Sequence, residues 1–93
     1  GATCVAGADG KLLGILTDHD LRRALAGDST DIRTGRVDAF MTKSPLSVRP
    51  GMLAAEAIAL TEKKSVSVLP VVGDDGVLAG IIHLHDLLRA GVQ

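Results

Sequence analysis

The chain has 93 residues, enough for one small domain or for two very small units that share a core. Hydrophobic residues make up 46% and charged residues 23%, a globular balance that excludes a disordered segment. The net charge of −1 and the single aromatic residue, Phe40, exclude a basic surface for nucleic acid or anionic lipid and a platform for stacked bases.

The cysteine content and the apolar runs are typical of a cytoplasmic protein. The single cysteine, Cys4, cannot form an internal disulfide, and we interpret it as an inert buried thiol. No apolar run approaches the roughly 20 residues that span a membrane, and no signal peptide is visible. We therefore expect a soluble, cytoplasmic protein without a membrane or nucleic-acid partner.

The first part of the chain predicts a hairpin followed by a helix. Residues 3–6 are typical of the end of an apolar strand, Asp9-Gly10 of a turn and residues 12–16 of the returning strand. A helix is expected from Asp18 to about Leu25, with Leu21 and Leu25 on one face. Residues 26–36 have the polar and glycine-rich composition of a linker.

Residues 37–93 predict a longer unit in the order strand, helix, strand, strand, helix. One helical turn is expected at 37–41, a short strand at 45–48 and an amphipathic helix at 52–64. Apolar strands are expected at 66–72 and 77–82, with a closing helix at 83–90. Strands this continuously apolar suggest a sheet covered on both faces.

The chain repeats itself: residues 7–24 return as residues 73–90, and most identities are retained. A repeat of this kind indicates one supersecondary unit used twice. At the same offset, the first copy contains only the last three elements of the second. We expect that roughly thirty residues of the first copy lie before Gly1.

The motifs of the second copy resemble a CBS domain from end to end. They are Val37-x-x-Phe-Met-Thr42, Pro45, Val48, Pro50, Leu69-Pro-Val-Val72, Asp75-Gly76, Gly80-Ile-Ile82 and Asp86-Leu87. The first copy resembles the latter half of another CBS domain, so the chain is similar to a CBS pair, or Bateman module. The resemblance implies an α+β fold of β-α-β-β-α repeats whose first repeat is N-terminally incomplete. It divides the chain into residues 1–25, a linker at 26–36 and a complete repeat at 37–93.

Two stretches resemble a narrower family, the C-terminal CBS pair of bacterial arabinose-5-phosphate isomerases. They are residues 16–25 and 82–91. In that family a sugar-isomerase (SIS) domain precedes the pair and interconverts ribulose 5-phosphate and arabinose 5-phosphate on the route to Kdo, an acidic sugar of lipopolysaccharide. The resemblance implies a regulatory, non-catalytic module, ligand clefts between the copies and a homodimer of CBS pairs.

Two strand-to-helix junctions carry the candidate ligand contacts. Thr17-x-x-Asp20 has the spacing of a capping box with Asp in place of Glu, and it also suits a ligand phosphate and ribose hydroxyls. In CBS domains this pattern is the nucleotide-ribose signature. The second copy retains Asp86 but has His83 where the first has Thr17, so the two sites should differ there. His83, His85 and Asp86 need not converge on a metal ion, and none is expected.

The resemblance implies further contacts around the base of a nucleotide. These residues are Thr42, Lys43, Ser44 and Pro45, with Ser67, Val68, Leu69 and Pro70. Pro70 has no N–H, which should leave nearby carbonyl groups free to contact a base edge. Val68 and Leu69 are equally consistent with a core strand. Candidate anion contacts are Arg22, Arg23, Arg89 and His85, although surface arginines are more often merely solvated.

The ligand is expected to be a nucleotide rather than a catalytic cofactor. CMP-Kdo, the activated product of the Kdo route, combines a ribose with an acidic sugar and would permit feedback control. AMP or ATP is the main alternative ligand. A module that binds no small molecule and only holds an oligomer together also remains open.

Overall fold

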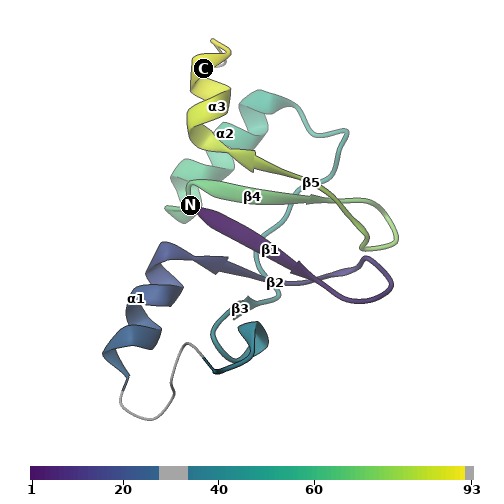
Figure 1. The fold of residues 1–93 in the computed structure, drawn as a ribbon. Coiled ribbons are helices and arrows are strands. Elements are labelled where there is room, and N and C mark those ends of the chain that lie inside the picture. Colours follow the sequence, from purple (N-terminus) through teal and green to yellow (C-terminus); the bar gives the residue numbers. More distant parts are fainter. Residues whose placement is uncertain (28–33, 92–93) are drawn as a thin grey trace. The chain divides into compact units, whose positions relative to one another are not determined.

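A computed structural model describes residues 1–27 and 34–91, so most of the predicted linker lies outside the described residues. The chain divides into two compact units, one from Gly1 to Pro45 and one that begins at Leu46. The first unit contains β1 (Ala2–Ala6), β2 (Leu12–Thr17), α1 (Asp18–Ala26), the 3₁₀ turn η1 (Val37–Ala39) and β3 (Thr42–Lys43) (Figure 1). The second contains α2 (Ala54–Lys64), β4 (Val68–Val72), β5 (Leu78–His83) and α3 (Leu84–Arg89).

The sequence repeat is also a repeat of backbone geometry. The hairpins β1–β2 and β4–β5 pair in the same register, with Ala2 opposite Thr17 and Val68 opposite His83. Gly10 and Gly76 both have a φ of 83°, a conformation that glycine adopts without strain. The predicted hairpins and helices are therefore confirmed, with ends shifted by one or two residues.

β3 adds a third strand to the first hairpin, and the sequence did not predict it. It pairs antiparallel with β2, with Gly14 opposite Lys43 and Ile15 opposite Thr42. A β-carbon at Gly14 would lie 2.5 Å from the Met41 sulfur, so the close approach of this segment requires a glycine. Because β3 pairs with β2, the chain packs as compact units that divide after Pro45, whereas the predicted repeat begins at Val37.

The core of the second unit lies between α2 and the β4–β5 hairpin. Three buried residues form its centre and five partly buried ones surround it: Val48, Ala57 and Leu69, then Met52, Leu60, Val71, Ile82 and Leu87. α2 buries Ala57, Ile58 and Thr61. The amphipathic pattern predicted a stripe of Leu53, Ala57 and Leu60, which is correct for Ala57 and in part for Leu60 but wrong for Leu53, whose side chain is 66% exposed. This core holds the β5–α3 junction in place.

The predicted strand at 45–48 is wrong except for its last residue. Val48 alone forms a parallel bridge, to Val71, and its N–H donates to the Pro70 carbonyl at 3.0 Å. To continue the parallel pairing back along the chain, the residue at position 70 would have to donate its N–H to Leu46. Proline has no such N–H, so the pairing stops after one bridge.

The expectation that the strands are covered on both faces holds only in part. The middle of β5, from Ala79 to Ile81, is exposed, and the side chain of Ile81 is 38% exposed where its counterpart Ile15 in β2 is 7% exposed. Leu25, expected on the packed face of α1, is also exposed. The described helices include none that combines the length and apolar character needed to cross a membrane.

Candidate functional site

The first candidate site lies where β2 ends and α1 begins. Thr17 has extended backbone geometry and caps α1, because its hydroxyl accepts from the Asp20 N–H at 3.2 Å. In return, the Asp20 carboxylate accepts from the Thr17 N–H at 2.8 Å and from its hydroxyl at 3.0 Å. The capping box predicted from Thr17-x-x-Asp20 is therefore present.

Two donors from outside the capping box also reach Asp20. The Thr42 hydroxyl, which comes from β3, donates to Oδ1 at 2.9 Å, and the Arg23 guanidinium donates to the same oxygen at 2.8 Å. Asp20 is only 2% exposed. Burial raises the pKa of its carboxyl, but the hydrogen bonds from Thr17 and Thr42 and the charge of Arg23 outweigh burial and leave the pKa below its usual value.

The second candidate site, where β5 gives way to α3, is built differently. His83 occupies the cap position but makes no side-chain cap hydrogen bond. The backbone contact is shared by the two junctions, since the Leu84 N–H donates to the Ser67 carbonyl at 2.8 Å and the Asp18 N–H to the Gly1 carbonyl at 3.3 Å.

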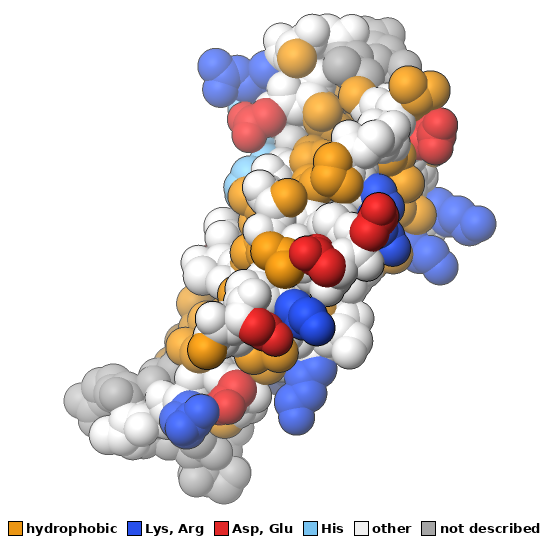
Figure 2. Space-filling model, turned by 90° about the vertical axis from the view of Figure 1, so that its right-hand side faces the viewer, with side chains coloured by type: hydrophobic (Ala, Val, Ile, Leu, Met, Phe, Trp, Pro, Cys, Tyr) orange, Lys and Arg blue, Asp and Glu red, His pale blue; other side chains and the backbone are white. Residues whose placement is uncertain are grey.

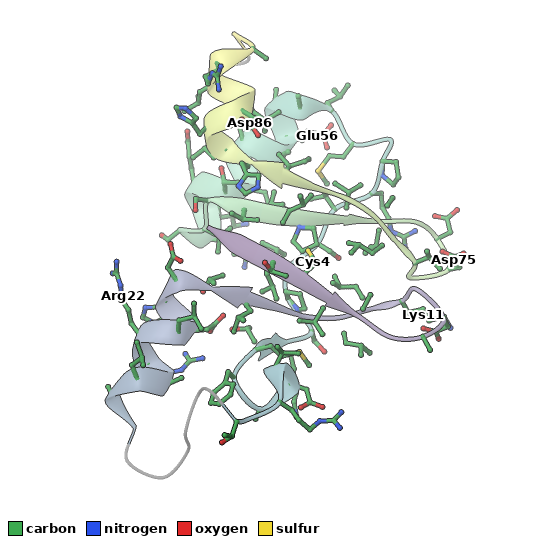
Figure 3. All side chains as sticks on the ribbon, viewed as in Figure 1. Cys4, Lys11, Arg22, Glu56, Asp75 and Asp86 are labelled. Carbon is green, nitrogen blue, oxygen red and sulfur yellow. The ribbon has the colours of Figure 1, made fainter. Side chains whose placement is uncertain are left out.

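Asp86 lies on the first turn of α3 and is exposed (Figure 3). Within the described residues its carboxylate has no hydrogen-bond partner. The two matched aspartates therefore differ: four donors bond the Asp20 carboxylate, whereas no donor among the described residues bonds that of Asp86.

The four residues at and before β4 that were predicted to surround a base differ in how deeply they are buried. Leu69 and Pro70 are buried, so their side chains belong to the core, whereas Ser67 is exposed and Val68 is partly exposed. The expectation that Pro70 leaves carbonyls free is wrong for its own carbonyl, which accepts from Val48. Only Ser67 and Val68 of this group present side-chain surface.

The residues around β3 lie next to the first site, but only one of them contacts it. Thr42 bonds Asp20, whereas no hydrogen bond to Asp20 is made by Lys43, Ser44 or Pro45. Ser44 has a φ of 48°, which is strained for a residue other than glycine, and its N–H donates to the Leu13 carbonyl at 3.3 Å. The segment is thus joined to β2 at this point by a single long hydrogen bond.

The candidate anion contacts are exposed, and among the described residues Arg23 is the one of them whose side chain has a hydrogen-bond partner, Asp20. Arg22 points away from the strands on α1 (Figure 3), and His85 and Arg89 are exposed on α3. The Arg23–Asp20 pair has the i, i+3 spacing of neighbours on a helix, a signal that the sequence does contain. The Thr42–Asp20 contact spans 22 positions, and no local pattern indicates it.

Metal-binding clusters and charge distribution were the remaining features that could mark a site in the described part of the chain. The described residues contain no group of three His, Cys, Asp or Glu side chains placed to hold a metal ion. Cys4, predicted to be buried, is only partly buried, and this partial burial raises the pKa of its thiol and favours the uncharged form. Acidic and basic side chains are interspersed on the face that Figure 2 shows. The chemistry offered at the two junctions is hydrogen bonding to hydroxyl groups and pairing with anions.

The comparison with protein families gives a match over most of the chain. The CBS domain family matches residues 2–27 and 37–93. Among curated proteins, the arabinose 5-phosphate isomerase KdsD of Pseudomonas aeruginosa is 46% identical over all 93 residues. The chain spans 28% of the length of that relative.

Solved structures with the same fold are CBS-domain proteins. ATU1752 of Agrobacterium tumefaciens is 32% identical with a TM-score of 0.83, and the match covers 99% of this chain and 72% of that one. CBSX2, solved in complex with AMP, is 27% identical with a TM-score of 0.83, and the match covers 97% and 72% of the two chains.

Proposed function

This chain belongs to the CBS-domain family, and from that premise we propose that it is the nucleotide-sensing regulatory part of an arabinose 5-phosphate isomerase. The observation that carries the proposal is the exposed Asp86 carboxylate, which lacks a protein partner among the described residues at a junction the chain has duplicated. Likeness to KdsD along the whole chain supports the isomerase as the regulated activity. Catalysis then resides in a SIS domain outside these 93 residues.

In the second unit, Asp86 accepts hydrogen bonds from the two ribose hydroxyls of the nucleotide. A carboxylate suits this task because it offers about four acceptor positions and no donor. His83, which caps nothing with its side chain, and Arg89 serve the anionic groups, with His85 beside them. Ser67 and Val68 contact the base.

In the first unit, Thr17 and Asp20 form the corresponding site, with Thr42 to Pro45 beside the base and Arg23 at the anionic group. This site already contains a complete set of internal hydrogen bonds, so it differs from the second in more than the exchange of Thr17 for His83. The two units therefore bind their ligands with different affinities.

We assign CMP-Kdo as the ligand, because it joins a ribose to a carboxylate-bearing sugar and is the activated product of the pathway that the isomerase feeds. It regulates the enzyme by binding two conformations of the protein unequally. AMP or ATP is the second candidate, supported by the likeness to CBSX2, which was solved with AMP. The module acts in the cytoplasm as a homodimer of CBS pairs.

A thermal-shift panel on the full-length protein tests the proposal. A ligand at 100 times its dissociation constant adds roughly 2.7 kcal/mol of stability, which a melting curve resolves. We expect a shift with CMP-Kdo that exceeds the shift with AMP, ATP or CMP. Asp86→Asn should reduce it, whereas Glu56→Gln on the exposed side of α2 should leave it unchanged.

Each other outcome of the panel has a distinct meaning. A larger shift with AMP or ATP would make the module an adenosine-nucleotide sensor. No shift with any nucleotide would refute nucleotide sensing and leave a module that only holds the oligomer together.

A further inference from the structure

The Asp20 carboxylate has no acceptor position left for a ligand. A carboxylate offers about four lone-pair positions. The Thr17 N–H and hydroxyl occupy Oδ2, while the Thr42 hydroxyl and the Arg23 guanidinium occupy Oδ1. A hydroxyl group arriving from solution can bond Asp20 only if one of these four donors leaves.

The four donors differ in how readily they can leave. Both Thr17 donors belong to the turn that starts α1, so their removal would undo the helix cap. Thr42 belongs to β3, a strand of two residues at the edge of the sheet, and Arg23 has a side chain that is 60% exposed. The two donors at Oδ1 are therefore the replaceable ones.

The second copy of the repeat shows what the junction is like when no such donor bonds the aspartate, although Arg89 stands at the place of Arg23. Asp86 has the same place in its unit as Asp20, yet it is exposed and has no partner within the described residues. His83 stands where Thr17 does, and β5 has no third strand in the described chain. Saturation of the carboxylate is thus specific to the first unit, which supplies Thr17 and β3.

We propose that Thr42 and Asp20 form a latch, which a ligand opens when its vicinal hydroxyl groups replace Thr42 and Arg23 at Oδ1. The inference rests on the proposed function, because the ligand is the ribose of the same nucleotide. In this exchange, hydrogen bonds from the ligand hydroxyl groups to Asp20 replace those from Thr42 and Arg23. Arg23 can then pair with an anionic group of the ligand.

Opening the latch loosens β3. Besides the Thr42 hydroxyl, β3 is held by its pairing with Gly14 and Ile15 and by the Ser44 N–H, which donates to Leu13 at the long distance of 3.3 Å. Loss of the Thr42 contact removes the only side-chain hydrogen bond that β3 makes within the described residues. Binding of the ligand at the first site thereby weakens the attachment of residues 42–44 to β2.

The test uses Thr42→Val, which keeps the branched shape and removes the hydroxyl, with Thr42→Ser as the matched control that retains it. Titration calorimetry measures binding of CMP-Kdo, CMP and AMP to each full-length variant. Since one hydrogen bond no longer competes, Thr42→Val should bind the better nucleotide roughly tenfold more tightly at the first site, and Thr42→Ser should match the wild type. Asp20→Asn combined with Thr42→Val should abolish the gain.

The outcomes separate the latch from the proposed function. If the wild type binds and Thr42→Val binds equally or more weakly, Thr42 is no latch, although nucleotide sensing stands. If neither the wild type nor Thr42→Val binds CMP-Kdo, CMP or AMP, the proposed function fails and the latch fails with it. Hydrogen exchange gives a second readout: ligand should speed exchange of the Ser44 amide in the wild type, and slower exchange there would refute the latch.

Discussion

Thr17 and His83 hold the same position in the two copies, yet only Thr17 caps its helix through its side chain. Replacing a capping threonine with alanine costs about 1 kcal/mol. We expect Thr17→Ala to lower the free energy of unfolding by about 1 kcal/mol or slightly more, because Asp20 also loses a donor, and His83→Ala to lower it by less. Urea denaturation of both variants measures the difference, and equal losses would contradict the assigned role of Thr17.

The lowered pKa of Asp20 makes the stability of the protein depend on pH. In the unfolded chain an aspartate titrates near pH 4. Burial opposes the charge of Asp20, but the donors from Thr17, Thr42 and Arg23 prevail, so its pKa in the folded state is lower. The carboxylate therefore contributes stability above about pH 4, and this contribution is lost as the pH falls through the folded-state pKa.

Asp20→Asn removes this contribution. We expect the free energy of unfolding of Asp20→Asn to fall less steeply than that of the wild type between about pH 5 and pH 2, as measured by urea denaturation at each pH. Parallel curves for the two proteins would show that the hydrogen bonds to Asp20 do not stabilise its charged form.

At the scale of elements, the two hairpins differ in what lies beside their second strand: β3 pairs with β2, whereas no described strand pairs with the far side of β5. A β-carbon at Gly14 would lie 2.5 Å from the Met41 sulfur and 2.7 Å from the Thr42 carbonyl oxygen, whereas at Gly80 it would meet nothing within 4 Å. We expect Gly14→Ala to displace β3 at a cost of about 1–3 kcal/mol. Gly80→Ala should change the free energy of unfolding by less than about 0.5 kcal/mol.

Hydrogen exchange distinguishes displacement of β3 from a general loss of stability. In Gly14→Ala the Ser44 amide should exchange faster, because its hydrogen bond to Leu13 holds only while β3 lies against β2. The β4–β5 hairpin should keep its protection. Equal destabilisation by the two alanines would argue against close packing of β3 at Gly14.

At the scale of the whole molecule, the sequence predicts what is local or repeated. Asp9-Gly10 and its copy at Asp75-Gly76 predicted both turns, and Thr17-x-x-Asp20 predicted the helix cap. The sequence could not predict that Thr42 reaches Asp20, because strand pairing brings together residues far apart in the chain and β3 is too short to leave a pattern. For the same reason the contrast between a saturated Asp20 and a free Asp86 emerged only from the fold.

If the module regulates an isomerase, binding of nucleotide and of sugar phosphate must be coupled in both directions. Suppose that CMP-Kdo changes the dissociation constant of a sugar phosphate by some factor, typically 5- to 150-fold. By linkage, the sugar phosphate must then change the dissociation constant of CMP-Kdo by the same factor. Calorimetry with arabinitol 5-phosphate, which isomerisation cannot consume, measures both factors. In the wild type we expect the two factors to be equal to each other and different from one, which means that each ligand changes the affinity for the other. A sugar-phosphate affinity that CMP-Kdo leaves unchanged would exclude regulation through substrate binding.

The open edge of β5 bears on how the isolated chain behaves at high concentration. Exposed residues from Ala79 to Ile81 line an edge where, in the described chain, no third strand pairs. Unpaired backbone groups along an apolar edge act as a template for strands of other molecules. In the first unit β3 covers the corresponding edge of β2, so this edge is open only in the second of the two described hairpins. Ile81→Lys would place a charge on it and should reduce self-association of the isolated chain through β5.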